Sequence, residues 1–136
     1  MARSPFQVEV LTPEGQAFSD EVEMVSTRTS VGSIGLLANH QPMLAMLDPT
    51  ELRLYKSESD VIRYAQGEGF LQISGVHALV LVDEVFEVDK LDRGELEDRL
   101  KRAEDEISKA EEGTEERRAA EREKRRYEAF LKITNS

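Results

Sequence analysis

The side chains best suited to acid–base or metal chemistry are few in this sequence and stand far apart. It contains two histidines, His40 and His77, and no cysteine, which excludes a thiolate nucleophile, disulfides and cysteine-based metal sites. Gly32 and Gly35 lie three residues apart, but neither the Walker spacing nor a glycine-rich loop leading into a helix is present. His40 has the chemistry of a ligand or base, yet it has no histidine nearby and His77 falls in an expected strand. We interpret residues 32–42 as a hairpin and its exit, and we expect no catalytic or metal site.

Basic side chains recur at helical spacing near the C-terminus. Arg118, Arg122 and Arg125 follow one another at i, i+4 and i+7, which places them on one face of a helix, with Arg126 beside them. We call these four residues the arginine stripe. Two interpretations stay open: a solvated basic face balanced by neighbouring glutamates, or a docking surface for an acidic partner.

Residues 90–136 have the pattern of an antiparallel two-helix hairpin that would carry the arginine stripe. Asp92 is suited to cap a first helix, and Glu95 three residues later completes a capping-box pattern. Gly113 interrupts the helical pattern, and Thr114 is placed to cap a second helix. The apolar positions of the first helix form one narrow stripe: Leu96, Leu100, Ala103, Ile107 and Ala110. Because so little apolar surface is shared, we expect a marginally stable hairpin that can dock, unfold or extend.

Residues 1–89 predict an antiparallel β-sandwich, because short segments alternate apolar and polar side chains between turn residues. Two hairpins are expected, formed by residues 51–55 with 61–65 and by residues 70–73 with 76–82. Ala78–Val82 is apolar at every position, which predicts a central strand covered on both faces. The predicted fold class is therefore α+β, with the sandwich first and the two-helix hairpin after it.

The charge of the chain is distributed unevenly. Of the net charge of −10, residues 1–89 carry 5 Lys+Arg against 14 Asp+Glu, while residues 90–136 carry 13 against 14. The acidic first part argues against binding of nucleic acid, which needs clustered Lys and Arg. No apolar run reaches the length of about 18 residues that a membrane helix requires, and the first residues do not resemble a signal peptide. We therefore expect contact with a membrane only through a partner.

Several segments, taken in order, resemble the epsilon subunit of bacterial F-type ATP synthases. Residues 32–44 resemble the G-E-[LI]-G-I-L-P-x-H-x-P-L-L stretch of that family. The other matching segments are residues 8–15, 23–25 and 67–71 and the pair Leu91-Asp92. The resemblance extends along nearly the full length.

The resemblance implies a ten-stranded sandwich and two helices in a non-catalytic subunit on the cytoplasmic face of the bacterial plasma membrane. The implied partners are the gamma subunit, the membrane c-ring and the alpha and beta subunits of the catalytic head. A loop at residues 32–40 is implied to face the ring. The residues expected there are Gly32, Ser33, Ile34, Gly35 and His40. Ser33 stands where the family has an acidic residue and Ala38 where it has proline, so a charged contact at position 33 is not expected.

The resemblance also assigns two roles to the hairpin. It is implied to fold against the sandwich or to extend toward the catalytic head and hinder ATP hydrolysis, with the arginine stripe meeting an acidic segment of the beta subunits. Some members bind ATP through an [IL]-D-x-x-R-A motif. Here Leu91 and Asp92 are kept, but Glu95 replaces the arginine and Leu96 the alanine. A carboxylate at Glu95 would repel phosphate, so we expect weak or absent ATP binding and no cofactor, unless Arg93 compensates.

Two other classes of function fit the sequence less well. An enzyme is disfavoured because the sequence has no paired-carboxylate or glycine-rich signature. An adaptor that grips varied clients with its hairpin would need an apolar tip. The expected tip, residues 111–116, is instead rich in glutamate.

Overall fold

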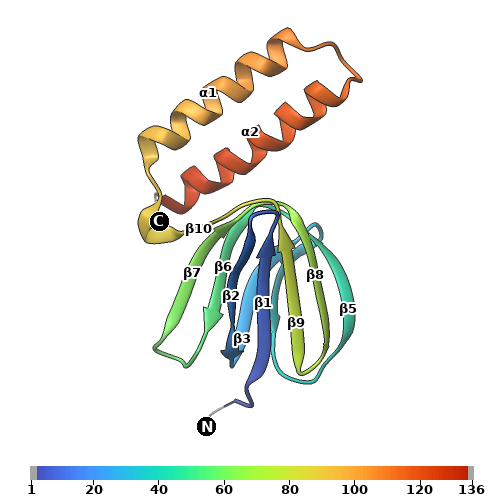
Figure 1. The fold of residues 1–136 in the computed structure, drawn as a ribbon, viewed down its shortest axis with the longest axis vertical. Coiled ribbons are helices and arrows are strands. Elements are labelled where there is room, and N and C mark those ends of the chain that lie inside the picture. The colour runs from blue at the N-terminus through green and yellow to red at the C-terminus, as the bar shows by residue number, and fades with distance from the viewer. Residues whose placement is uncertain (1–2, 135–136) are drawn as a thin grey trace.

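The computed structural model describes residues 3–134 and consists of ten strands followed by two helices (Figure 1). The strands are β1 (Phe6–Thr12), β2 (Gly15–Val22), β3 (Met24–Thr29), β4 (Gly32–Leu36), β5 (His40–Leu47), β6 (Thr50–Tyr55), β7 (Val61–Gln66), β8 (Gly69–Gly75), β9 (His77–Val82) and β10 (Val85–Glu87). A short 3-10 turn (Val88–Lys90) leads to α1 (Arg93–Lys109) and α2 (Glu115–Thr134). The predicted order of sandwich and hairpin is confirmed. Neither helix of the described residues is long and apolar enough to cross a membrane.

The strands form one continuous sheet that folds over itself into a sandwich. Their order is β10-β7-β6-β3-β5-β8-β9-β1-β2, with β4 paired to β3 outside this path. The two halves of the sheet are joined between β3 and β5, which pair through Thr29 and Leu47 alone. All neighbouring strands are antiparallel except β1 and β9, which run parallel. The two predicted hairpins are confirmed as β6 with β7 and β8 with β9.

Strand β9 departs from the prediction in one respect. It lies between β8 and β1, as expected of a central strand, but it is not covered on both faces. Ala78, Val80 and Val82 point into the core, whereas Leu79 is half-buried and Leu81 is 42% exposed. The prediction of double coverage was wrong because an apolar outward side chain does not require a second layer in the same chain.

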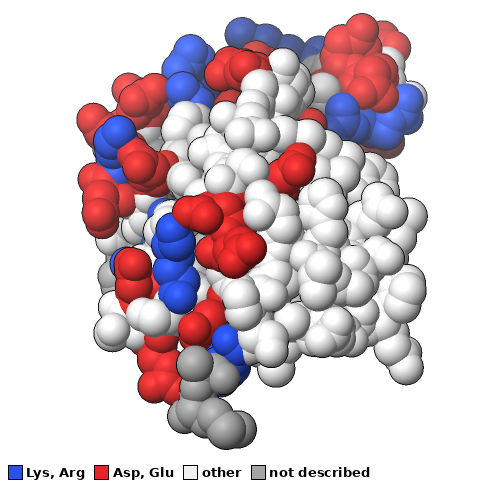
Figure 2. All heavy atoms as spheres, turned by 60° about the horizontal axis from the view of Figure 1, so that its bottom comes forward, with Lys and Arg blue, Asp and Glu red and all other residues white. Residues whose placement is uncertain are grey.

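Leu81 belongs to a larger apolar surface on the outside of the sandwich. The strand register places Met46 of β5 opposite Phe70 of β8, and Phe70 opposite Leu81. With Leu44, these four residues are 42–70% exposed, and we call them the apolar sheet face. A broad area without charged side chains is visible on this side of the molecule (Figure 2). Exposed apolar side chains gathered on one face are typical of interaction sites.

The outer face of the other half of the sandwich is polar. Arg53 of β6 and Arg63 of β7 lie directly opposite each other, and Glu51 bridges them, accepting hydrogen bonds from Arg63 at 2.8 and 2.9 Å and pairing with Arg53. The hydrogen bond from Arg63 lowers the pKa of Glu51 to about 2, against the opposing effect of burial. This face therefore carries paired charges and differs in kind from the apolar sheet face.

The ends of the helices follow the sequence pattern. The Asp92 side chain accepts a hydrogen bond from the Glu95 amide at 3.1 Å, and Thr114 accepts one from the Arg117 amide at 3.3 Å. Glu95 does not close the predicted capping box, since its carboxylate pairs with Arg99 at 2.9 Å. Gly113 adopts a positive φ of 79° between the helices, a backbone conformation that glycine adopts without the strain of a side chain.

Gly69 is the glycine whose replacement the structure tolerates least. A Cβ atom at this position would lie 1.9 Å from the carbonyl oxygen of Leu81 and 2.8 Å from the Cα atom of Val82. Because both are backbone atoms, we expect Gly69→Ala to reduce the free energy of unfolding by about 3 kcal/mol. Gly94→Ala, in the exposed first turn of α1, is the matched control and should leave stability unchanged or slightly raised. Urea unfolding followed by circular dichroism measures both, and equal midpoints would contradict the packing described.

Candidate functional site

The helical hairpin lies across one end of the sandwich (Figure 1) and is held there by a second apolar core. Its buried members come from β7, α1 and α2: Ala65, Leu96, Tyr127, Phe130 and Ile133. The Phe130 ring meets Phe86 edge-on at 6.0 Å between centroids and Tyr127 at 6.3 Å. Edge-to-face contacts of this kind stabilise beyond the area they bury. The C-terminal half of α2 is thus the part of the hairpin most firmly attached to the sandwich.

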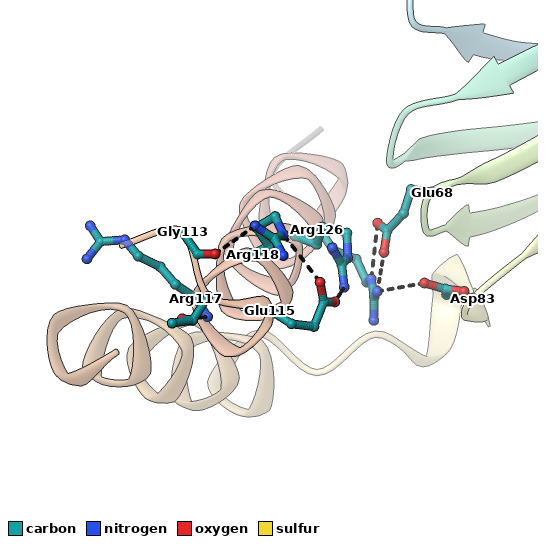
Figure 3. A network of polar contacts seen from close by, with 9 residues as sticks. Glu68, Asp83, Gly113, Glu115, Arg117, Arg118 and Arg126 are labelled. Carbon is teal, nitrogen blue, oxygen red and sulfur yellow. Dashed lines mark hydrogen bonds and ion pairs between the residues drawn. The ribbon is translucent and has the colours of Figure 1, made fainter. Parts of the chain in front are cut away.

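A polar contact lies beside this core and is centred on Arg126 (Figure 3). Its guanidinium pairs with Glu68, which receives a second hydrogen bond from Nε at 3.3 Å. It also lies 3.3 Å from Asp83 Oδ2 and 3.1 Å from Glu84 Oε2. Glu68 stands in the turn between β7 and β8, and Asp83 and Glu84 stand in the turn between β9 and β10. We call these three carboxylates the acidic cluster.

The turn that carries Glu68 is shaped and fixed by its neighbours. A Cβ atom at Gly67 would lie 3.2 Å from Nε of Arg126, so glycine leaves room for the arginine. The fully buried Gln66 accepts a hydrogen bond from the Thr27 hydroxyl at 2.7 Å. Its amide nitrogen donates to the carbonyl oxygens of Asp48 and Gly67 at 3.2 and 3.0 Å. The turn therefore presents Glu68 in one defined position.

The electrostatics of this contact favour the ionised pair. Burial raises the pKa of the Glu68 carboxyl, but the hydrogen bond and charge of Arg126 outweigh it, so the pKa is lowered. Burial likewise opposes the charge of Arg126, yet Glu68 and Glu84 raise its pKa above the ordinary value. The pKa of Asp83 is raised, first by burial and then by the neighbouring Glu68 carboxylate. Glu68 is the principal partner of Arg126. Asp83 is the member of the acidic cluster whose ionised form is disfavoured.

The arginine stripe does not present four equivalent side chains in this conformation. Arg118 and Arg122 share the carboxylate of Glu115 at 3.3 and 2.9 Å, and Arg118 also donates to the Gly113 carbonyl at 3.0 Å (Figure 3). Arg125 is exposed. Arg126, which helical spacing places beside the other three, is buried against the sandwich. Helical spacing predicts which side chains share a face, but it gives no sign of the acidic cluster on a distant part of the chain.

Two further arginines, Arg99 and Arg117, make contacts that no sequence pattern predicts. The Arg99 guanidinium of α1 lies 5.7 Å from the centres of both the Phe86 and Tyr127 rings, within the range of a cation–π contact. Arg117 of α2 donates to the carbonyl oxygens of Ile107 and Ala110 at 3.3 Å each. It thereby satisfies carbonyls at the C-terminal end of α1.

The residues that resemble the nucleotide motif surround only a small hollow. It has a volume of about 40 Å³ and is lined by Phe86, Lys90, Leu91, Asp92, Glu95, Leu96 and Arg99. A space of this size accommodates a few water molecules at most. Arg93, the candidate substitute for the missing arginine, pairs with Glu97 at 3.0 Å. In the docked form these residues build the start of α1 and its contact with the sandwich.

The segment expected to form a loop facing the ring is not a loop. Gly32, Ser33, Ile34 and Gly35 lie in strand β4, and His40 opens β5 after a short turn. Gly32 has a positive φ of 135°. Gly35 sits in mid-strand, where an added Cβ atom would have no neighbour closer than Met24 Cε at 4.0 Å. Gly32 and His40 thus lie in different strands, Gly32 at the start of β4 and His40 at the start of β5.

The histidines do not form a metal site. His40 Nδ1 lies 2.8 Å from the Gln41 carbonyl oxygen, and His77 Nε2 lies 3.4 Å from Glu9. Within residues 3–134, no group of three or more His, Asp or Glu side chains is placed to hold a metal ion.

This geometry defines a class of protein: a β-sandwich with an exposed apolar face and a helical hairpin docked through an ion-pair cluster. The family model described as ATP synthase, Delta/Epsilon chain, beta-sandwich domain matches residues 5–88. The ATP synthase epsilon chain of Sulfurihydrogenibium sp. (strain YO3AOP1) is 30% identical over 131 residues, covering 96% of this chain and 98% of that protein. The chain belongs to the family of ATP synthase epsilon chains.

Solved structures share the fold. A chain in the cryo-EM structure of the Euglena gracilis mitochondrial ATP synthase has a TM-score of 0.76 at 17% identity, covering 96% of this chain and 81% of that chain. A chain in the central stalk and c-ring of the Tetrahymena thermophila mitochondrial ATP synthase has a TM-score of 0.60 at 16% identity, covering 98% and 99%. The predicted combination of sandwich and hairpin is confirmed by both likenesses.

Phe130 offers a direct test of how the hairpin is attached. Phe130→Ala removes a fully buried ring from the second core, and we expect docking of α2 to weaken by about 3 kcal/mol. Hydrogen exchange of the α2 amides measures this as faster exchange, while the strands of the sandwich keep their protection. Glu128→Ala, at an exposed position two residues earlier, is the control. Similar exchange in the two variants would show that the second core does not hold the hairpin.

Proposed function

We propose that this chain is a non-catalytic central-stalk subunit of an F-type ATP synthase, which couples c-ring rotation to the catalytic head. The observation that carries the proposal is its membership of the epsilon chain family along 131 residues. The apolar sheet face is the surface proposed to pack on the gamma subunit, because it is exposed and uncharged. Strand β4 and the turn to His40 form the proposed contact with the ring. The subunit would be attached peripherally, at the cytoplasmic face of the bacterial membrane, with no nucleic acid involved.

The hairpin is proposed to restrain ATP hydrolysis when it leaves the sandwich and extends toward the alpha and beta subunits. Support comes from its mode of attachment: a small second core and an ion-pair cluster hold it against the sandwich. Once released, the arginine stripe is available to an acidic surface of the beta subunits. A partner shifts such an equilibrium only by its difference in affinity for the two forms.

The hydrolysis assay tests both parts of this proposal. The cognate catalytic head, depleted of this subunit, receives the full chain, a chain ending at Asp89, or the full chain with Arg118, Arg122 and Arg125 changed to alanine. We expect inhibition by the full chain, none by the truncated chain, and inhibition reduced several-fold by the triple variant. Lys124→Ala on the same helix is the control. If no form binds the head, the assignment as a stalk subunit fails; if all bind and none inhibits, only the restraining role fails.

The hairpin is proposed to work without bound ATP, because Glu95 places a carboxylate where a phosphate-binding arginine would stand. Isothermal titration of the isolated chain with ATP should give no binding at micromolar concentrations. Glu95→Arg is the matched variant, and any affinity gained there would locate the defect at this position. Micromolar binding by the unaltered chain would refute the proposal.

A further inference from the structure

We propose that the acidic cluster is an arginine-binding site whose resident ligand is Arg126, and that its occupancy sets the fraction of molecules with a docked hairpin. The docking equilibrium is a property of the isolated chain. Only its consequence for ATP hydrolysis rests on the function proposed above.

The cluster is built to receive a guanidinium group. Carboxylates from two separate turns surround Arg126, and all three of its nitrogens lie within 3.3 Å of one of them. The side chains of Arg126 and Glu68 are only 10% and 18% exposed. Gly67 leaves the space that the arginine occupies, with Nε at 3.2 Å from where a Cβ atom would stand. A planar fork with several donors suits this arrangement, whereas the single ammonium of lysine does not.

An empty cluster would be unfavourable. Without Arg126, three carboxylates would remain close together, and one oxygen of Glu84 is already buried with the ion pair as its only polar contact. The nearest other cations are Arg99, 3.6 Å from Glu84, and Arg122, which lowers the pKa of Asp83 from a distance. Arg99 reaches the cluster through Glu84, and Arg122 acts on it from a distance, so neither takes the place that Arg126 occupies. Removal of one partner from a buried ion pair is costly because the remaining charge stays uncompensated.

The same arginine serves two competing contacts under this proposal. Arg126 belongs to the helix that carries the arginine stripe, and its guanidinium cannot donate to the acidic cluster and to a partner's carboxylates at once. Release of the hairpin would therefore expose Arg126 and simultaneously vacate the cluster. Carboxylates on the partner and on the sandwich compete for one cation, so each strengthens its own conformation at the expense of the other.

The absence of cysteine in the sequence allows the equilibrium to be measured directly. Ser59→Cys on the β6–β7 turn and Glu112→Cys at the hairpin tip, both exposed, accept a pair of fluorescent labels whose energy transfer reports docking in increasing urea. We expect Arg126→Ala and Glu68→Gln each to lower the ratio of docked to released hairpin at least tenfold. Arg126→Lys should fall in between. Arg125→Ala, the neighbouring exposed arginine, should change the ratio less than twofold.

Chemical rescue identifies the ligand class. Ethylguanidinium added to Arg126→Ala should restore docking, while ethylammonium at equal concentration should not, and neither should act on the double variant with Glu68→Gln. Circular dichroism confirms that the helices persist in each variant. Equal docking in Arg126→Ala and Arg125→Ala, or equal rescue by both compounds, would overturn the proposal. A shifted ratio without any change in inhibition would leave the binding site in place and remove the restraining role instead.

Discussion

The close approach of two backbone segments at Gly69 is the constraint on which the other contacts depend. At this point β8 passes so near the Leu81 carbonyl that no side chain fits between them. The β7–β8 turn is thereby brought beside the β9–β10 turn, and Glu68 comes within reach of the same arginine as Asp83. The buried Gln66 next to this turn makes three hydrogen bonds, one of them to the Gly67 carbonyl in the turn. The backbone packing at Gly69 thus positions the two turns that carry the acidic cluster.

Two different forces hold the hairpin, and they have different consequences. Burial of Phe130 and its neighbours is non-directional and supplies most of the attraction. The ion pairs of Arg126 add direction, because they require one register of α2 over the two turns. Surface pairs such as those of Glu115 contribute little to stability, since water screens them. They do, however, neutralise arginines that would otherwise repel one another along α2.

Features set by neighbours in the sequence could be predicted, and features set by distant residues could not. Asp92 and Thr114 cap helices through groups three residues away, so their roles were visible in the sequence. Arg126 pairs with Glu68, 58 residues earlier, and helical spacing alone cannot show such a contact. The coverage of the outer face of β9 was predicted wrongly for a related reason. Apolar composition does not show whether another layer of the protein covers a strand. The segment 32–40 matched the family motif for a loop, yet residues 32–36 form a strand, because glycine also occurs in edge strands.

The parallel pairing of β1 with β9 has a consequence for the order in which the chain acquires its structure. Gln7 through Leu11 find their parallel partners only at His77 through Leu81, so β1 is made before the other strands of the sandwich but is completed by one of the last of them. Contacts of such long sequence separation slow folding, because a large loop must close before they form. Until then β1 can pair only with β2, as an isolated hairpin of marginal stability. The sandwich is therefore expected to close late, after most of its residues have left the ribosome.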